Sequence, residues 1–164
     1  MTIYKVYLMR VVVGMLISFA GLCSALVGAE KPERPSASQD MVVSEAQVQV
    51  PIPGKNLTSA YFVLRNKGEH PRQLVGVQAD FAARTELHGH EMKDGMARMR
   101  RQDSVIIAPR SELRFESGGH HVMLFDLKLR PRTGDVLELV LEFGDGSHKR
   151  VSAQAVSVFD RSHH

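Results

Sequence analysis

The chain has 164 residues, of which 43% are hydrophobic and 24% charged, a composition typical of one globular domain with a substantial core. It excludes collagen-like, coiled-coil and wholly disordered proteins. A single Cys excludes an intramolecular disulfide framework and every multi-cysteine zinc or iron–sulfur site, so the eight His and eight Met become the residues of interest.

Residues 1–29 have the features of a secretory signal peptide. Two basic residues precede an uncharged apolar run, and the small residues at its end suit cleavage after Ala29. An apolar run of this length could also serve as an uncleaved membrane anchor, which is the alternative prediction. Cys23 raises the possibility of a lipoprotein, but the bulky Leu22 precedes it where a lipidation signal needs a small residue.

Removal of the leader changes the charge of the chain. The leader contains Lys5 and Arg10 and no acidic residue, so the formal net charge of +3 falls to +1 with His neutral. No large basic patch remains to predict nucleic-acid binding. The only Cys leaves as well, so the mature protein has no thiol to oxidise in an exported, oxidising compartment. We therefore expect a periplasmic protein.

The mature chain is predicted to begin with a linker and continue as strands. Residues 30–41 are polar and rich in Pro and Ser, which predicts the linker. Alternation of apolar and polar residues, or short apolar runs, then predicts strands over residues 42–50, 61–64, 74–77, 86–92, 97–103, 112–116, 137–143 and 151–159. Residues 160–164 are expected to be a tail.

The strand patterns also predict which side chains are buried. In the first strand, Val42, Ala46, Val48 and Val50 are expected to share one buried face. The short apolar runs 61–64 and 74–77 are expected to be buried on both faces.

Turn signals rich in Gly, Pro, Asn and Asp separate these strands at short intervals. No segment of the mature chain has a convincing pattern for a long helix. Short strands at this spacing predict an all-β fold, an antiparallel β-sandwich or barrel formed by one domain over residues 42–159.

His and Met are concentrated in one part of the sequence. The leader removes three Met, and eight of the remaining thirteen His and Met fall within residues 88–123. They are His88, His90, Met92, Met96, Met99, His120, His121 and Met123. Imidazole and thioether groups without thiolate form a soft, neutral ligand set, which suits Cu(I) and is poor for Mg, Ca or Mn. Zinc would accept the imidazoles but gain little from the thioethers.

Strand geometry makes a shared site feasible. His121 and Met123 are two residues apart, so they project from the same face of a strand. The dipeptide at 94–95, Asp-Gly, predicts a two-residue hairpin that pairs residues 86–92 with 97–103. In that register His90 lies opposite Met99 and His88 lies diagonal to it, so geometry leaves both His as candidates and slightly favours His90.

Several His and Met have a simpler interpretation. Met92 and Met96 are predicted to fill the core, as single strand Met residues usually do. His90 and His120 are predicted to be exposed or to contact the ligand side chains without binding the metal themselves. His70 and His148 are predicted to be solvated. His163 and His164 could bind a divalent ion weakly, but a tail is the simpler prediction.

The spacing of four residues resembles a known family. His88, Met99, His121 and Met123 match the H-x10-M-x21-H-x-M pattern of the PCu(A)C-type periplasmic copper chaperones. The sequence around them is also similar to that family, and the resemblance extends over roughly residues 42–157.

The resemblance implies a cupredoxin-like β-sandwich that binds one Cu(I) through His88, Met99, His121 and Met123. It selects His88 where geometry alone favoured His90. It also implies that copper is delivered to the Cu(A) centre of cytochrome c oxidase, directly or together with a Sco-type copper protein. We expect a monomer.

No enzyme motif is found. The segment 90–94 begins like the H-E-x-x-H motif of zinc proteases but has Asp94 in place of the second His, and no catalytic triad is recognisable. We therefore expect a protein without catalytic activity. Alternative roles are copper tolerance or storage, a copper redox accessory, or a structural sandwich. A blue-copper redox site is disfavoured because it needs a Cys ligand.

Overall fold

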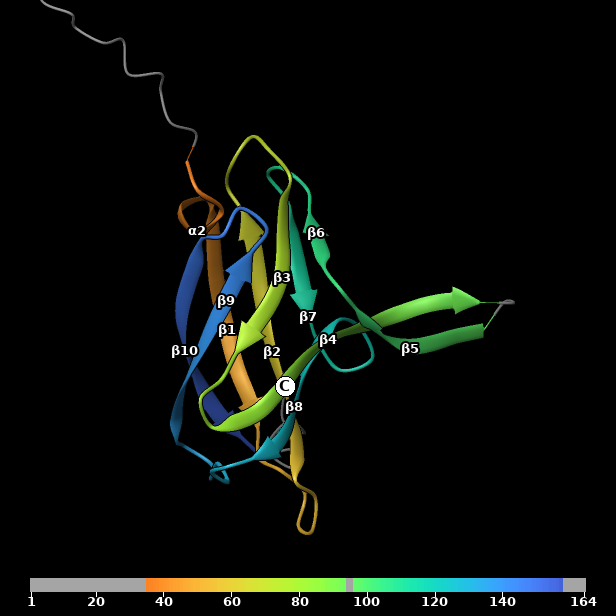
Figure 1. Ribbon diagram of the computed structural model, residues 1–164, viewed down its shortest axis with the longest axis vertical. Helices are drawn as coiled ribbons and strands as arrows, with labels where there is room; N and C mark the ends of the chain where they lie inside the picture. The colour runs from red at the N-terminus through yellow and green to blue at the C-terminus, as the bar shows by residue number, and fades with distance from the viewer. Residues whose placement is uncertain (1–34, 94–95, 158–164) are drawn as a thin grey trace, which may run out of the picture. The chain divides into compact units, whose positions relative to one another are not determined.

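The computed structural model describes residues 35–93 and 96–157, and these are almost entirely strands (Figure 1). The elements are α2 (Ala37–Asp40), β1 (Met41–Gln49), β2 (Leu57–Asn66), β3 (Arg72–Gln78), β4 (Ala82–Lys93), β5 (Met96–Gln102), β6 (Val105–Ile107), β7 (Glu112–Phe115), β8 (His121–Leu127), β9 (Val136–Phe143) and β10 (His148–Val156). Within these residues, no helix has the length and apolar character that crossing a bilayer requires.

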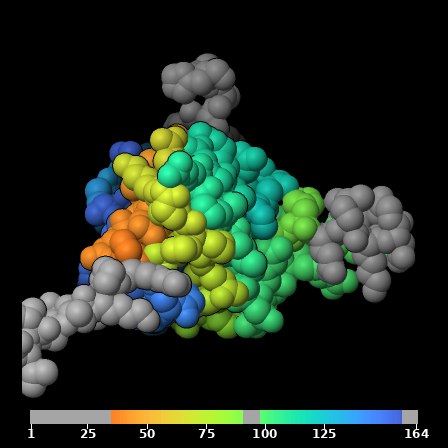
Figure 2. Space-filling model, turned by 90° about the horizontal axis from the view of Figure 1, so that it is seen from above, coloured from red at the N-terminus to blue at the C-terminus, as the bar shows by residue number. Residues whose placement is uncertain are grey.

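The strands form one hydrogen-bonded sheet in the order β5-β4-β8-β2-β1-β10-β9-β3-β6. Strand β2 joins the parts of this sheet, because it pairs with β1 on one side and with β8 and then β7 on the other. Figure 2 shows the yellow surface around β2 and β3 between the orange surface of β1 and the green-to-teal surface that follows β5. All pairs are antiparallel except β1 with β10, which is parallel.

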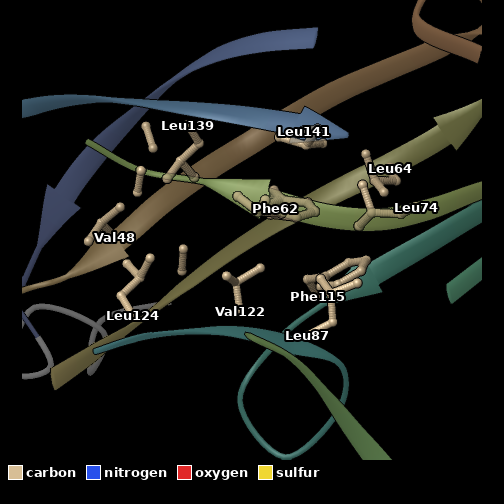
Figure 3. Packing of buried hydrophobic residues seen from close by; sticks show 14 of the residues in the cluster. Val48, Phe62, Leu64, Leu74, Leu87, Phe115, Val122, Leu124, Leu139 and Leu141 are labelled. Carbon is tan, nitrogen blue, oxygen red and sulfur yellow. The ribbon is translucent and has the colours of Figure 1, made fainter. Parts of the chain in front are cut away.

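The sheet bends back on itself so that its inner face encloses the core (Figure 3). The alternation predicted at 137–143 is confirmed, because Leu137, Leu139, Leu141 and Phe143 are all buried. Phe62 of β2 stacks on Phe115 of β7 with ring centroids 4.5 Å apart. The predicted all-β sandwich is confirmed.

Strand β1 differs from its predicted pattern. A bulge interrupts its pairing with β2 between Ser44 and Gln47, and Glu45 within it has φ 53°. The extra residue reverses which side chains face inward. Val43 and Ala46 therefore both pack on the core, and the expectation that Val42 shares a face with Ala46 is wrong.

The prediction that both apolar runs are buried on two faces is only partly right. Residues Phe62 to Leu64 of β2 are buried, since β2 lies in the middle of the sheet. In β3, by contrast, Leu74 and Val77 are buried while Val75 is 41% exposed. Strand β3 lies near the edge of the sheet, and only one of its faces packs on the core.

Part of the predicted linker is structured. The helical turn α2 begins after Ser36, and the Asp145 carboxylate accepts a hydrogen bond of 2.6 Å from the Ala37 backbone N–H. Arg72 forms an ion pair with Asp40, whose side chain is mostly buried. These contacts fasten α2 to the β9–β10 turn and to β3, so the linker expectation fails from residue 37 onward. The predicted leader (1–29) and tail (160–164) lie outside the described residues.

The long hairpin of β4 and β5 has the predicted register. Lys93 pairs with Met96, which leaves a two-residue connection as the Asp-Gly dipeptide predicts. Figure 1 shows the far end of this hairpin extending beyond the neighbouring strands. Its near end joins the sheet because β4 also pairs with β8, from Ala82 to His88.

Candidate metal centre

Three adjacent strands bring the candidate ligands to one face of the sheet. In the β4–β8 pair, His88 lies opposite His121 and Glu86 lies opposite Met123. In the β4–β5 pair, His90 lies opposite Met99. Cross-strand partners and residues two apart share a face. His88, Met99, His121 and Met123 are therefore brought together on the same side.

The opposite side of these strands belongs to the core. Leu87 and Val122 pair with each other directly behind the candidate ligands, and their exposed fractions are 4% and 0%. Packing at this pair holds β4 against β8, so the spacing between the two candidate His rings is set by a rigid part of the molecule.

The two His rings are close enough to share an ion. The ring centroids of His88 and His121 are 5.5 Å apart and the rings are tilted by 50°. An imidazole nitrogen lies about 2 Å from a bound first-row metal, so one ion between the rings can reach both. His121 is 8% exposed and the side chain of His88 is 20% exposed, so the pair lies at the base of the site.

The environment of His121 keeps one nitrogen available. Its Nδ1 lies 3.1 Å from the backbone carbonyl oxygen of Gly119, which can only accept a hydrogen bond. Nδ1 therefore carries the proton and Nε2 presents a lone pair on a neutral ring. Burial lowers the pKa of His121, against the effect of the Gly119 hydrogen bond, and the nearby His88 and His90 lower it further. The ring is thus neutral and able to bind a metal at neutral pH.

Glu86 positions the second ring. Its Oε2 lies 2.8 Å from Nε2 of His88, and Arg84 and Arg101 flank the same carboxylate. The His88 hydrogen bond lowers the pKa of Glu86, burial opposes this, and the Coulombic attraction of both arginines favours the carboxylate. The Glu86 carboxylate accepts a hydrogen bond from Nε2 of His88, so Nδ1 is the ring nitrogen left to bind a metal.

Sequence reasoning missed Glu86, although a simple signal was present. Glu86 stands two residues before His88, so on a strand the two side chains must share a face. The strand was predicted, and the same-face rule would have placed a carboxylate beside a candidate ligand.

The two methionines differ in their surroundings. Met123 is partly buried, and its Sδ accepts a hydrogen bond of 3.3 Å from the Ser59 hydroxyl on β2. Met99 is 42% exposed, on the part of the hairpin that lies beyond β8. Thus Met123 is held in place by the sheet, whereas Met99 is open to solvent on the same face.

The remaining His residues lie apart from this pair or at its margin. His120 is half-buried, and its Nδ1 lies 3.1 Å from Oε1 of Gln102, so it supports the hairpin. His70 and His148 are exposed, as predicted. His90 is exposed on the same face as His88.

Several other predictions fall on residues that cannot be compared. The side chains of Met92 and Met96, together with His163 and His164, lie outside the described part of the structure.

The donor set determines what the site can hold. Among the side chains that the structure describes, which leave out residues 91–97, no three His, Asp or Glu are arranged to hold a metal by themselves. Two imidazoles and two thioethers, in contrast, share one face, and such donors match a soft monovalent ion. Glu86 fits as a hydrogen-bond partner of a ligand, since its carboxylate is already taken up by His88 and the arginines.

Comparison with protein families gives one extended match. Residues 41–155 match the family model LpqE-like, described as "Putative lipoprotein LpqE-like". A lipoprotein of Leifsonia xyli subsp. xyli, also described as putative, is 30% identical over 152 residues, 92% of this chain and 88% of the relative. An uncharacterized protein of Rickettsia prowazekii is 26% identical, with 87% of this chain and 93% of the relative covered.

Solved structures of PCuAC domains share the fold. The copper-bound PCuAC domain from PmoF2 matches with a TM-score of 0.63 and 20% identity, covering 76% of this chain and 99% of that domain. The Cu(I) form of DR1885 from Deinococcus radiodurans matches with a TM-score of 0.60 and 32% identity, covering 70% of this chain and 76% of that one. The resemblance to PCu(A)C-type proteins drawn from the His and Met spacing is confirmed.

Proposed function

Because this chain belongs to the LpqE-like family and has the fold of the PCuAC domains, we propose that it is a periplasmic Cu(I)-binding metallochaperone. The ligands of the proposed site are His88, Met99, His121 and Met123. The observation that supports this set most directly is the cross-strand pair of His88 and His121, whose rings lie 5.5 Å apart on the face that also carries both methionines.

The proposed ligand set favours copper in the +1 state. Two neutral imidazoles and two thioethers leave the bound centre with a net charge of about +1, whereas Cu(II) prefers harder donors in a tetragonal arrangement. Thioethers carry no proton to lose and form no disulfides in an oxidising compartment. The protein can therefore carry copper without taking part in redox chemistry, and we propose binding and transfer rather than catalysis.

The position of the site suits release of the metal. His121 and Met123 lie in the sheet, while Met99 lies on the solvent side. A recipient protein can therefore replace the exposed donor first and the inner donors later. We propose that the recipient is the Cu(A) subunit of a respiratory oxidase, a Sco-type copper protein, or both.

Export outside the cytoplasm is part of the same proposal. The LpqE-like family and the Leifsonia relative are described as lipoproteins, a class attached to membranes outside the cytoplasm. The apolar leader of this chain agrees with export. We propose that the leader is a cleaved signal peptide, with a membrane anchor as the alternative.

A Cu(I)-chelator competition on the mature domain tests the copper site. The wild type is expected to bind one Cu(I), and the Met99→Ala, Met123→Ala double variant to bind at least about 100-fold more weakly. His148→Ala is a matched control, because His148 is exposed and lies outside the site. X-ray absorption of the copper-loaded protein is expected to show sulfur neighbours. Equally weak binding by wild type and double variant would contradict the proposal.

A transfer assay tests the proposed recipients. The Cu(I)-loaded protein is mixed with the copper-free soluble domain of a Cu(A) subunit or with a copper-free Sco-type protein, and copper is measured on each after separation. Transfer to either is the expected result. Tight binding without transfer to both would instead favour copper storage or tolerance.

A further inference from the structure

One exposed His on the site face has no place in the proposed ligand set. His90 is the next residue after His88 on the same face of β4, and it lies opposite Met99 of β5. Directly opposite residues of antiparallel strands have Cβ atoms about 5 Å apart. His90 and Met99 therefore form a second cross-strand pair, one step further from the sheet than the pair of His88 and His121.

The surroundings of this outer pair leave its donor atoms accessible. His90 is exposed and Met99 is 42% exposed. Among the described residues, His90 makes no hydrogen bond and no ion pair. This contrasts with the inner rings, since His88 is held by Glu86 and His121 by Gly119.

Met99 links the two pairs. It lies opposite His90, and it lies diagonal to His88 because His88 pairs with Arg101, two residues further along β5. Diagonal neighbours on one face are about 7 Å apart at their Cα atoms, within reach of a long flexible side chain such as Met. The Met99 thioether can thus turn toward either His ring.

The outer pair is more exposed than the inner pair. His121 is 8% exposed, the His88 side chain is 20% exposed, Met99 is 42% exposed, and His90 is exposed. These residues lead from the packed β4–β8 pair toward the free part of the hairpin, which extends beyond the neighbouring strands in Figure 1.

We propose that His90 and Met99 form an outer position for Cu(I), through which copper enters and leaves the inner position at His88, His121 and Met123. This inference rests on the proposed copper-binding function and extends it. One imidazole and one thioether are soft donors suited to Cu(I), and two donors leave the ion open to a ligand of a partner.

The transfer is a ligand exchange without redox chemistry. Copper bound by the inner donors and Met99 gains a bond to the His90 ring as it loses its bonds to His121 and Met123 and then to His88. The donor of the recipient next binds as the bonds to His90 and Met99 break. Copper stays in the +1 state throughout. Its coordination number falls from four donors at the inner position to two at the outer position, and donors of the recipient then replace His90 and Met99.

The test compares affinity with transfer rate in matched variants. His90→Ala and His90→Gln are compared with His88→Ala and with the distant exposed control His148→Ala. Affinity is measured by equilibrium competition, and transfer by stopped-flow absorbance after mixing the Cu(I)-loaded protein with the chelator bathocuproine disulfonate. Circular dichroism and urea unfolding check that each variant is folded.

The proposal predicts different outcomes for the two His positions. Both His90 variants are expected to keep the wild-type affinity within about threefold but to transfer copper at least about tenfold more slowly, while His88→Ala loses affinity by about tenfold or more. With excess Cu(I), a second equivalent of the ion is expected to bind the wild type more weakly than the first. NMR is expected to show that this second equivalent shifts the His90 ring signals.

Three results would overturn the proposal, and they are distinguishable. Wild-type transfer rates in both His90 variants would exclude the outer position. Loss of affinity in His90→Ala equal to that in His88→Ala would assign His90 to the inner site. Absence of Cu(I) binding by the wild type would refute the copper-binding function itself, and the outer position with it.

Discussion

Replacing Met123 by Leu tests whether its thioether is a ligand rather than a packing group. Leu fills nearly the same volume as Met, so the cost in unfolding free energy is expected to stay below about 1.5 kcal/mol, including the lost hydrogen bond from Ser59. Loss of one of four donors is expected to weaken Cu(I) binding about 100-fold, which corresponds to about 2.8 kcal/mol.

The same change has a calculable effect on metal-dependent stability. At a free Cu(I) concentration about 100 times the wild-type Kd, binding stabilises the folded wild type by about 2.7 kcal/mol. At that concentration the Met123→Leu variant would be half-saturated, and it would gain only about 0.4 kcal/mol. Urea unfolding with and without buffered Cu(I) measures both quantities.

The matched control is Met41→Leu. Met41 is fully buried in the core, on β1 and away from the site, so this change tests packing without removing a proposed donor. It is expected to alter the unfolding free energy by a similar amount and to leave Cu(I) stabilisation at the wild-type value. Equal Cu(I) stabilisation of Met123→Leu and the wild type would refute the reasoning that Met123 binds the metal.

Three further predictions follow from the charged and polar contacts. Because burial lowers the pKa of His121, the unfolded chain takes up its proton first, so the copper-free protein is expected to lose stability as the pH falls below about 6.5; a smaller pH dependence of the urea midpoint in His121→Gln would check this. Glu86→Leu is expected to remove the acceptor that holds the proton on Nε2 of His88, which 15N chemical shifts of the imidazole would reveal as a change in tautomer populations, and unchanged shifts would contradict the positioning role. Arg72→Met is expected to destabilise the fold by about 3 kcal/mol, since it leaves the mostly buried Asp40 unpaired, with unchanged Cu(I) affinity; a loss below about 0.5 kcal/mol in urea unfolding would show that this ion pair is not needed.

Much of the fold follows from local patterns. Alternation at residues 137–143 identified the buried side chains of β9, and the Asp-Gly dipeptide set the register of β4 on β5. Both are short-range effects, because the side-chain period of a strand and the conformation of a two-residue turn depend on neighbouring residues alone.

Other features depended on contacts between distant segments. The bulge of β1 moved Val42 off the core face, and its position is defined only by pairing with β2. The helical turn at Ala37–Asp40 forms where a linker was expected, since Asp145 and Arg72 bind it from far along the chain. Neither partner can be recognised from the local composition of residues 30–41.

The candidate metal site also depends partly on local sequence and partly on contacts between distant segments. The sequence by itself determined that this is one all-β domain, since length, composition and strand period are properties of the sequence. It also determined a set of soft donors, from the spacing of His88, Met99, His121 and Met123. Only the tertiary structure decided that β8 pairs with β4, which brings His121 opposite His88 and leaves His90 and Met99 on the exposed hairpin. The physical reason is that strand order in a sheet is set by long-range packing, here of Leu87 on Val122, which no local pattern specifies.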